Sequence, residues 1–528
     1  MKPDIFPKKI LIGDDAREKI SAGVEVMYEV ARAAYGPKAG NVMYENNWPV
    51  GASKISRDGV TNLEKVSLSD RAENIAAKAV LQASKKNNAT VGDGTTAVAI
   101  LTYHLYAAGR KLISSGHNQM EVAKMIDDTA EKAIEYIDSI KEPLTDDGLL
   151  DVAKVSCGDD AIAQLLADTV KEVGSEGGVT VEEHTGLGVY AEAIDGFYMR
   201  KGFTDVRLVK DGGTLSSDFE NVPIFLTDKV ISQDREMASI LNQIVGNGYK
   251  EILILGEVMQ DALEFLVMQR TSGKIIATVA GIPATAGMKS IVLDDLAALT
   301  GAKVYNHGNS ADDFNLDFLG AAKRVIVEEL STTILDGAGD QKEIKRRLDE
   351  LESQLESETH QVTTMAIKDR IARLKGRVGI VKVGAPTDID REELRLRVDD
   401  AVCALQAARR DGIVPGGGTT LARVTGTPFD STLQQLFIEL MNNAGEKAEY
   451  KLGKVLEKPI GFGYDLKNMT DEPIDLRESG IIDPALVIKE VVRNACSVAS
   501  KLITTTVVMV FSDEANETML DMIKEGRR

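Results

Sequence analysis

A change of pattern near Gly177 constrains the fold more than any other feature of the sequence. Before it, apolar residues such as Ile20, Val24 and Met27 recur at spacings of three and four, which indicates amphipathic helices. After it, short β-prone runs such as VTVEE and EILILGE alternate with helical segments, a pattern typical of an α/β domain. Helical spacing returns from Val398. We therefore predict two α-rich ends around an α/β insert, and expect that the ends could form one domain.

The chain is too long for a single hydrophobic core. At 528 residues it is expected to form about two to four domains. The charged segment from Ile344 to Leu374 carries Leu348, Leu351 and Leu355 on one side. This segment predicts an amphipathic helical hairpin packed on the middle domain, since fewer than about three heptads are sustained for a coiled coil.

Composition excludes several classes of protein. The formal net charge of −20 argues against a surface that binds nucleic acid or anionic lipid. Neither a signal-peptide stretch at the start nor a run of about 18 apolar residues is found, so we expect a cytoplasmic protein with no membrane partner. Cys157, Cys403 and Cys496 are far apart and form no CxxC pair, which predicts reduced, semi-buried thiols rather than disulfides or a zinc site.

The sharpest candidate site is the motif Gly92-Asp93-Gly94-Thr95-Thr96 at the predicted start of a helix. Two glycines, a helix N-terminus and two hydroxyls can together bind an anion such as phosphate. Asp93 is well placed to hold Mg²⁺, which commonly takes one or two carboxylates and completes its shell with water and phosphate oxygens. An ordinary N-capped helix is the alternative interpretation, and the motif by itself leaves it open.

Other loops add weaker signals of the same kind. Glycine turns occur at 36–38, at 58–59, where Asp58 precedes Gly59, and at 416–418. Asp400 lies in an apolar-periodic segment, where an inward carboxylate would need a partner such as a metal or a water. The alternative interpretation is that Asp400 lies together with Asp399 on a solvated face of the helix. The sequence contains no GxxxxGK[ST], HExxH or GxSxG motif, which excludes a Walker-type phosphate loop.

Five blocks of sequence, taken in order, resemble the nucleotide-site blocks of one family, the group I chaperonins of the GroEL type. Segments between them, such as KVISQDREMASIL and VGIVKVGAPTDID, also resemble that family, so the likeness runs almost from end to end. The five blocks are GPKAGNV (36–42), ISRDGVT (55–61), VGDGTTA (91–97), RVDDAVCALQAARRDGIVPGGG (397–418) and SGIIDP (479–484).

The resemblance implies a multidomain α and α/β protein with the chaperonin fold. Its parts would be a mostly helical equatorial domain, a small intermediate domain and an α/β apical domain that binds polypeptide. The implied segments are 1–139 and 411–528 for the equatorial domain, 140–189 and 378–410 for the intermediate domain, and 190–377 for the apical domain.

The resemblance also implies an activity, namely an ATP-hydrolysing chaperone that helps non-native polypeptides to fold. Asp93 would hold Mg²⁺, and Asp58 and Asp400 would orient and activate the attacking water. Because Asp400 lies on the implied intermediate domain, hydrolysis would require that domain to close. The remaining residues that match the family's nucleotide contacts are Gly36, Pro37, Lys38, Gly94, Thr95, Thr96, Gly417 and Asp483.

The implied partners are non-native polypeptides, a co-chaperonin lid of the GroES type, and copies of the same chain in a homo-oligomer of seven-membered rings. From the residues alone, the apolar stripe of the predicted client-binding helix favours core packing instead. The positions that match the family's polypeptide contacts are Tyr198, Phe203, Leu241, Leu263, Val267 and Met268.

Two departures from the family concern hydroxyl groups. Ala34 and Ala97 stand where the family has threonine, near the phosphates and the monovalent cation. We therefore expect altered turnover or an altered dependence on K⁺, the candidate second ion. Two alternatives stay open, namely a chaperonin-fold scaffold or holdase with weak or lost ATP turnover, and an ordinary metabolic ATPase.

Overall fold

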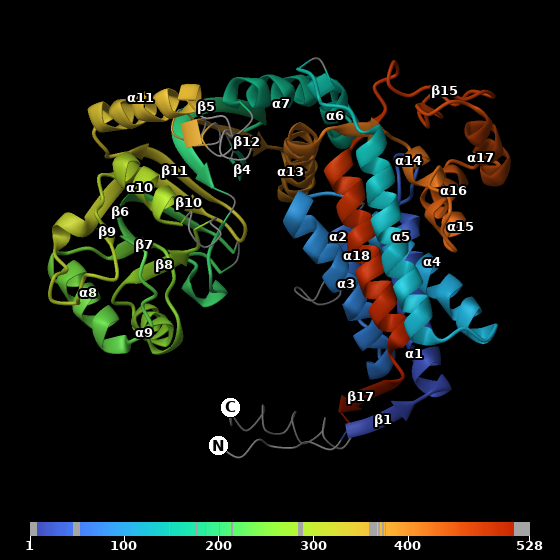
Figure 1. Cartoon of the computed structure of the whole chain (residues 1–528), viewed down its shortest axis with the longest axis horizontal. Helices are drawn as coiled ribbons and strands as arrows, with labels where there is room; N and C mark the ends of the chain where they lie inside the picture. The colour runs from blue at the N-terminus through green and yellow to red at the C-terminus, as the bar shows by residue number, and fades with distance from the viewer. Residues whose placement is uncertain are drawn as a thin grey trace. The chain divides into compact units, whose positions relative to one another are not determined.

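The computed structural model describes residues 8–45, 53–56, 58–146, 148–174, 178–184, 186–199, 201–212, 215–282, 289–357, 367, 370–371, 374 and 376–511. The chain divides into two compact units (Figure 1). Unit 1 combines Met1–Ala167 with Thr387–Arg528, and unit 2 is Asp168–Pro386. Both helical ends of the chain therefore belong to one unit. The finer division into five segments stays a prediction.

Long helices build the core of unit 1. The C-terminal helix α18 packs against α3, α4 and α5, although some 400 residues separate it from them in sequence (Figure 1). Each helix turns an apolar face inward, and Val24, Ile100 and Ile126 are completely buried. The helices concerned are α1 (Asp14–Ala33), α3 (Arg71–Val91), α4 (Thr95–Ser114), α5 (Gln119–Ile140) and α18 (Ala485–Thr504).

Shorter elements complete unit 1 and carry the loops of interest. In the described residues, four two-stranded antiparallel ribbons are β1 (Lys8–Ile12) with β17 (Val507–Phe511), β2 (Val42–Glu45) with β3 (Ser53–Ser56), β13 (Ile413–Pro415) with β16 (Ile482–Pro484), and β14 (Phe462–Gly463) with β15 (Ile474–Asp475). The other elements are α2 (Gly59–Glu64), α6 (Gly148–Cys157), α7 (Asp160–Val173), whose residues from Asp168 belong to unit 2, α13 (Asp388–Asp411), α14 (Thr419–Ala422), α15 (Asp430–Leu433), α16 (Gln435–Asn443) and α17 (Ala448–Glu457).

A mixed sheet forms the centre of unit 2. Its strand order in the described residues is β4-β12-β5-β11-β10-β6-β7-β8, with β9 paired to β6. The strands are β4 (Val179–Glu183), β5 (Gly188–Met199), β6 (Ser217–Thr227), β7 (Glu251–Leu255), β8 (Ile276–Ala280), β9 (Val304–Tyr305), β10 (Leu319–Val327), β11 (Thr332–Gly337) and β12 (Arg377–Gly384).

Helices cover both faces of this sheet, which explains the almost continuously apolar strand sequences. Side chains along β7 alternate between two cores: Ile252 and Ile254 pack with α8 (Asp234–Gly246) and α9 (Gln260–Thr271), whereas Leu253 and Leu255 pack with α10 (Lys289–Thr300). The predicted combination of helical ends and an α/β middle is therefore confirmed.

Of the charged hairpin predicted over 344–374, the structure describes α11 (Gln341–Ser357), which packs on α10, and residues 367, 370, 371 and 374; the rest lies outside the described residues. Leu351, Ile367 and Leu374 form a small apolar cluster. Asp295 of α10 is 3% exposed, and both Arg347 and Arg370 donate hydrogen bonds to its carboxylate. A buried carboxylate thus binds both Arg347 of α11 and Arg370.

Two predictions from composition can be compared with the coordinates. Among the described residues the three cysteines form no disulfide; Cys157 and Cys496 are buried and Cys403 is partly buried. In the described part of the chain, no helix is both long enough and apolar enough to cross a membrane.

Candidate functional site

The loop between α3 and α4 holds the Gly92–Thr96 motif. Gly92 ends α3 with φ of 71°, and Gly94 precedes α4 with φ of 78°, both left-handed conformations that favour glycine. A Cβ on Gly94 would lie 2.6 Å from Val491 Cγ2, and a Cβ on Gly92 would overlap Cys403. Among the described residues no side chain caps α4. Its first N–H groups therefore stay available for an anion, and the alternative of an ordinary side-chain-capped helix does not hold.

Asp58 lies beside the start of α4. It caps α2, where its Oδ2 accepts a hydrogen bond of 2.6 Å from the Thr61 backbone N–H. Gly59, the next residue, packs directly on the hydroxyls of Thr95 and Thr96, where a side chain would overlap them. The missing side chain thus allows two helix N-termini, each with an aspartate, to approach closely.

Asp400 is brought to the same place by α13. This helix packs on the α3–α4 loop through Cys403, whose Cβ and Sγ occupy the space above Gly92. Asp400 lies three residues before Cys403 and is half-buried. Burial raises its pKa well above the usual value, and the charges of Asp93, Asp58 and Asp399 raise it further. A solvated helix face, the alternative left open by the sequence, does not fit this environment.

Asp58, Asp93 and Asp400 lie close enough for their charges to interact, and we call the space beside them the recess; of the three, Asp93 lines a cavity there. Burial and the charge of Asp58 raise the pKa of Asp93, although the Gly94 N–H donates a hydrogen bond of 2.5 Å to its carboxylate. Like charges that raise one another's pKa are stabilised by a cation between them.

The residues present fit a magnesium ion that is completed by a ligand. Within the described residues, no group of three or more His, Cys, Asp or Glu side chains is arranged to hold a metal. Mg²⁺ needs only one or two carboxylates when phosphate oxygens and water supply the rest of its shell. Asp93 at the start of α4 offers such a carboxylate next to the anion-binding N–H groups.

The second glycine loop and Asp483 lie at the other end of the recess. The β13–β16 ribbon pairs Val414 with Asp483, and a Cβ on Gly416 would lie 3.1 Å from Asp483 Oδ1. Gly417, with φ of 64°, has nothing closer to its Cβ position than a backbone oxygen at 4.0 Å, so its backbone is open to a ligand. Burial and the charge of Asp93 raise the pKa of Asp483 to about 7.

A cavity of about 150 Å³ is lined by residues of the α3–α4 loop and of β16, but not by Asp58 or Asp400. Of the predicted residues, Asp93, Gly94 and Asp483 line it together. The sequence interpretation missed Tyr35 as a lining residue, although it directly precedes the predicted Gly36 turn. It also missed Thr420 and an apolar wall made of Leu421, Leu436, Pro484, Val487, Ile488 and Val491.

The Gly36-Pro37-Lys38 turn follows α1 and lies against α16. A Cβ on Gly36, whose φ is 90°, would overlap Leu440. Asn443 Nδ2 donates hydrogen bonds to the backbone oxygens of Arg32 and Tyr35, at 2.7 and 2.8 Å. Lys38 is exposed.

The six predicted polypeptide contacts in unit 2 do not form one surface. Leu263, Val267 and Met268 share α9; the first two are half-buried and Met268 is 61% exposed. Leu241 is only 3% exposed in the core between α8 and the sheet, so in this conformation it is a core residue and offers no surface to a client. Packing on the sheet accounts for that burial.

The two aromatic residues of this set lie elsewhere in unit 2. Phe203 packs with the core on the α10 side of the sheet. The ring of Tyr198 lies against Gly178 and belongs to a small cluster with Leu335 and Val378.

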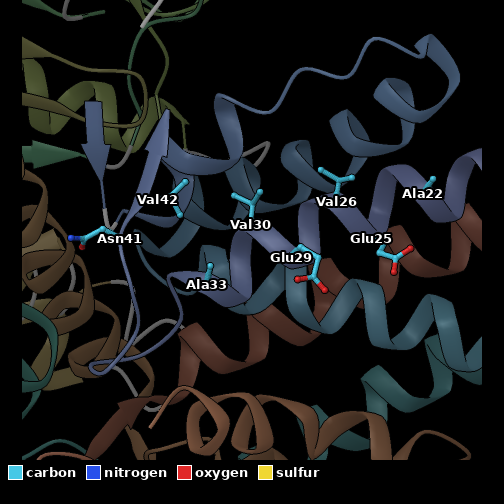
Figure 2. A pocket seen from close by; sticks show the side chains of 8 residues that line it. All are labelled: Ala22, Glu25, Val26, Glu29, Val30, Ala33, Asn41 and Val42. Carbon is cyan, nitrogen blue, oxygen red and sulfur yellow. The ribbon is translucent and has the colours of Figure 1, made fainter. Parts of the chain in front are cut away.

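A larger, shallow groove of about 720 Å³ runs along α1 (Figure 2). Val26, Val30, Glu25 and Glu29, all on α1, are among the residues that line it. It lacks the glycine loops and clustered aspartates of the recess and has the character of a packing surface. The lining is completed by Ala22, Ala33, Asn41 and Val42.

Comparison with known proteins identifies the fold and the family. The chaperonin gp146 from bacteriophage EL 2 (Pseudomonas aeruginosa), crystallised in the presence of ATP-BeFx, matches in two crystal forms with TM-scores of 0.74 and 0.64. Identity is 18% and 19%, and each match covers 96% of this chain and 99% of the other. A family model for TCP-1/cpn60 chaperonins matches residues 27–512, which supports a chaperone role. The predicted chaperonin fold is therefore confirmed, and the chain belongs to the TCP-1/cpn60 chaperonin family.

Proposed function

We propose that this chaperonin binds and hydrolyses ATP and uses the reaction to control the binding and release of non-native polypeptides. The observation that carries the proposal is the convergence of Asp58, Asp93 and Asp400 at the uncapped start of α4. A triphosphate needs N–H donors for its oxygens and carboxylates for its metal and its attacking water, and this recess offers both. The ATP-BeFx in the phage chaperonin crystals is consistent with nucleotide use in this fold.

Each residue of the recess has a proposed role. The N–H groups and hydroxyls of Thr95 and Thr96, with Gly94, bind phosphate oxygens, and Asp93 would hold Mg²⁺, which when bound neutralises charge on the transferred phosphoryl group. Asp58 and Asp400 orient the attacking water. Asp400 suits the role of general base, because burial and the neighbouring aspartates raise its pKa above the usual value of a carboxyl group and so make it a stronger base.

At the nucleoside end, Gly417 and Asp483 would contact the base and the ribose. The open backbone at Gly417 leaves room for a flat ring, and the Asp483 carboxylate beside Gly416 can accept hydrogen bonds from sugar hydroxyls. Gly36, Pro37 and Lys38 would line the nucleotide where α1 ends.

Unit 2 would bind the client. Leu263, Val267 and Met268 on α9, together with Met259 at its start, present apolar atoms to solvent. Such a surface binds unfolded chains with little sequence preference, because hydrophobic burial is non-directional. The same helix would receive a co-chaperonin lid of the GroES type, as the resemblance to group I implies. Tyr198 and Phe203 would need to leave their present packing to take part.

Exposed ribbons in unit 1 support self-association. Ile10, Ile12 and Met509 on the β1–β17 ribbon, and Met43 and Ile55 on the β2–β3 ribbon, are each more than half exposed. Each two-stranded ribbon has free edges that can pair with another chain. We propose a cytoplasmic homo-oligomeric ring of seven subunits held in part by these ribbons.

The test is Mg²⁺-dependent ATP hydrolysis by the wild type and by Asp400→Ala. Loss of a general base should lower kcat by about a hundredfold or more with nucleotide binding retained. Asp388→Asn, on the first turn of the same helix and 91% exposed, is the matched control and should hydrolyse ATP as the wild type does. Equal turnover in wild type and Asp400→Ala would refute the proposed site.

A second function is favoured by one observation, since Ala97 lines the cavity where the family has a hydroxyl. A holdase would suppress aggregation of a denatured client without hydrolysing ATP. Aggregation suppression by wild-type protein that lacks turnover would favour this function over the first.

Native mass determination tests the ring, because a species well below seven subunits contradicts it.

A further inference from the structure

Tyr35 is an aromatic residue held at the wall of the nucleotide cavity. It lies at the end of α1, immediately before the Gly36 turn, and its backbone oxygen accepts the 2.8 Å hydrogen bond from Asn443. Its ring is packed between the apolar core of the long helices and the cluster around α16 and α17. Packing and the Asn443 hydrogen bond together fix the ring without involving its hydroxyl.

The hydroxyl of Tyr35 is not engaged by any other described part of the chain. No hydrogen bond to it forms within the residues that the structure describes, whereas Thr420, the other hydroxyl-bearing residue that lines the cavity, donates to the Pro415 backbone oxygen at 2.7 Å. Ala97 contributes only a methyl group. Tyr35 is thus the uncommitted hydroxyl donor among the lining residues, and a phenol packed in such a wall usually finds a partner.

Tyr35 lines the same cavity as Asp93, in the α3–α4 loop, and Asp483, in β16. Burial raises the pKa of Tyr35, and the carboxylates of Asp483 and Asp93 raise it further. The phenol therefore stays protonated and acts as a donor at physiological pH. In the proposed site the outer phosphates of the nucleotide lie at Asp93 with the metal, and the ribose lies at Asp483. The phosphate nearest the sugar would then lie beside the Tyr35 hydroxyl.

We infer that the Tyr35 hydroxyl donates a hydrogen bond to the phosphate chain of the bound nucleotide, close to the sugar, and so makes the site select phosphorylated nucleosides. This inference rests on the proposed ATP site. It assigns to a side chain a contact that the surrounding glycines can provide only through their backbone. It also supplies a hydroxyl donor to a wall where Ala97 has none.

The experiment is calorimetric binding of Mg-ADP and of adenosine to the full chain and two variants. Tyr35→Phe removes the hydroxyl alone and should bind Mg-ADP about tenfold more weakly or worse, the usual effect of losing a hydrogen bond to a charged group. Its affinity for adenosine should be unchanged. Tyr136→Phe, which alters a half-buried tyrosine of α5 outside the cavity, is the matched control and should bind both ligands as the wild type does.

Different outcomes test the Tyr35 hydrogen bond and the proposed ATP site. Unchanged Mg-ADP affinity in Tyr35→Phe would overturn the inference, as would an equal loss of affinity for adenosine, which would place the contact on the sugar. Wild-type protein that binds neither ATP nor ADP would instead refute the proposed function. Far-UV circular dichroism and the thermal midpoint should be the same in all three proteins, because the hydroxyl has no folded-state partner to lose.

Discussion

Replacing Gly92 by alanine should destabilise unit 1 and lower ATP turnover through one loop. Gly92 has φ of 71°, where a residue with a Cβ costs about 1–2 kcal/mol. The new Cβ would also overlap the Cβ and Sγ of Cys403, and such overpacking costs about 1–3 kcal/mol. The two effects together predict a loss of about 2–5 kcal/mol in the free energy of unfolding.

A matched variant separates the two contributions. Gly158 also follows a helix of unit 1 with φ of 70°, but nothing lies within 4 Å of its Cβ position. Gly158→Ala should therefore cost only the conformational part, about 1–2 kcal/mol, and leave turnover unchanged. Urea unfolding followed by circular dichroism at equal protein concentrations measures both variants. Equal costs for the two variants would refute the claim that α13 packs tightly on the α3–α4 loop.

Two further predictions concern the recess and the client surface. The pKa of Asp483 is raised from 3.8 to about 7, so this group makes the folded state less stable as pH rises from about 4 to 7; Asp483→Asn should flatten that fall in urea unfolding, and an unchanged pH profile would contradict it. Leu241→Ala should cost about 2–5 kcal/mol as a core truncation, whereas Met268→Ala should stay within about 0.5 kcal/mol yet weaken capture of a denatured client in an aggregation assay. Loss of capture without loss of stability in Leu241→Ala would show that Leu241 reaches clients after all.

Much of the architecture could be predicted from the sequence, because hydrophobic spacing reports which side chains share a face. The spacing separated the helical ends from the α/β middle, and the near-continuous apolar run at 251–255 matched a strand buried on both faces. Spacing does not report how deeply a face is buried. Leu241 and Met268 both lie on helices beside the same sheet, yet one is core and the other is surface. That difference depends on tertiary packing alone.

Some residues of the candidate site could also be predicted from the sequence, and others could not. Glycine turns and aspartates formed visible motifs, since a left-handed turn requires glycine and leaves a signature. Tyr35 formed no motif, because a single aromatic residue at the end of a helix is equally consistent with core packing. Its place in the cavity depends on α16 and on β16, which are supplied by residues some 400 positions later. Only the assembled unit brings them together.

The contact between Gly92 and Cys403 links the two parts of the site. Asp400 lies about one helical turn before Cys403, so the helix that carries the proposed base is positioned by direct packing on the α3–α4 loop. A displacement of α13 that opened this contact would also move Asp400 away from Asp93, and should thereby disable the proposed hydrolysis without disturbing the N–H groups at the start of α4. Nucleotide binding and nucleotide cleavage should therefore respond differently to a change at this contact. In Gly92→Ala, kcat should fall more steeply than nucleotide affinity, and an equal fall in both would show that the loop itself, rather than α13, had been displaced.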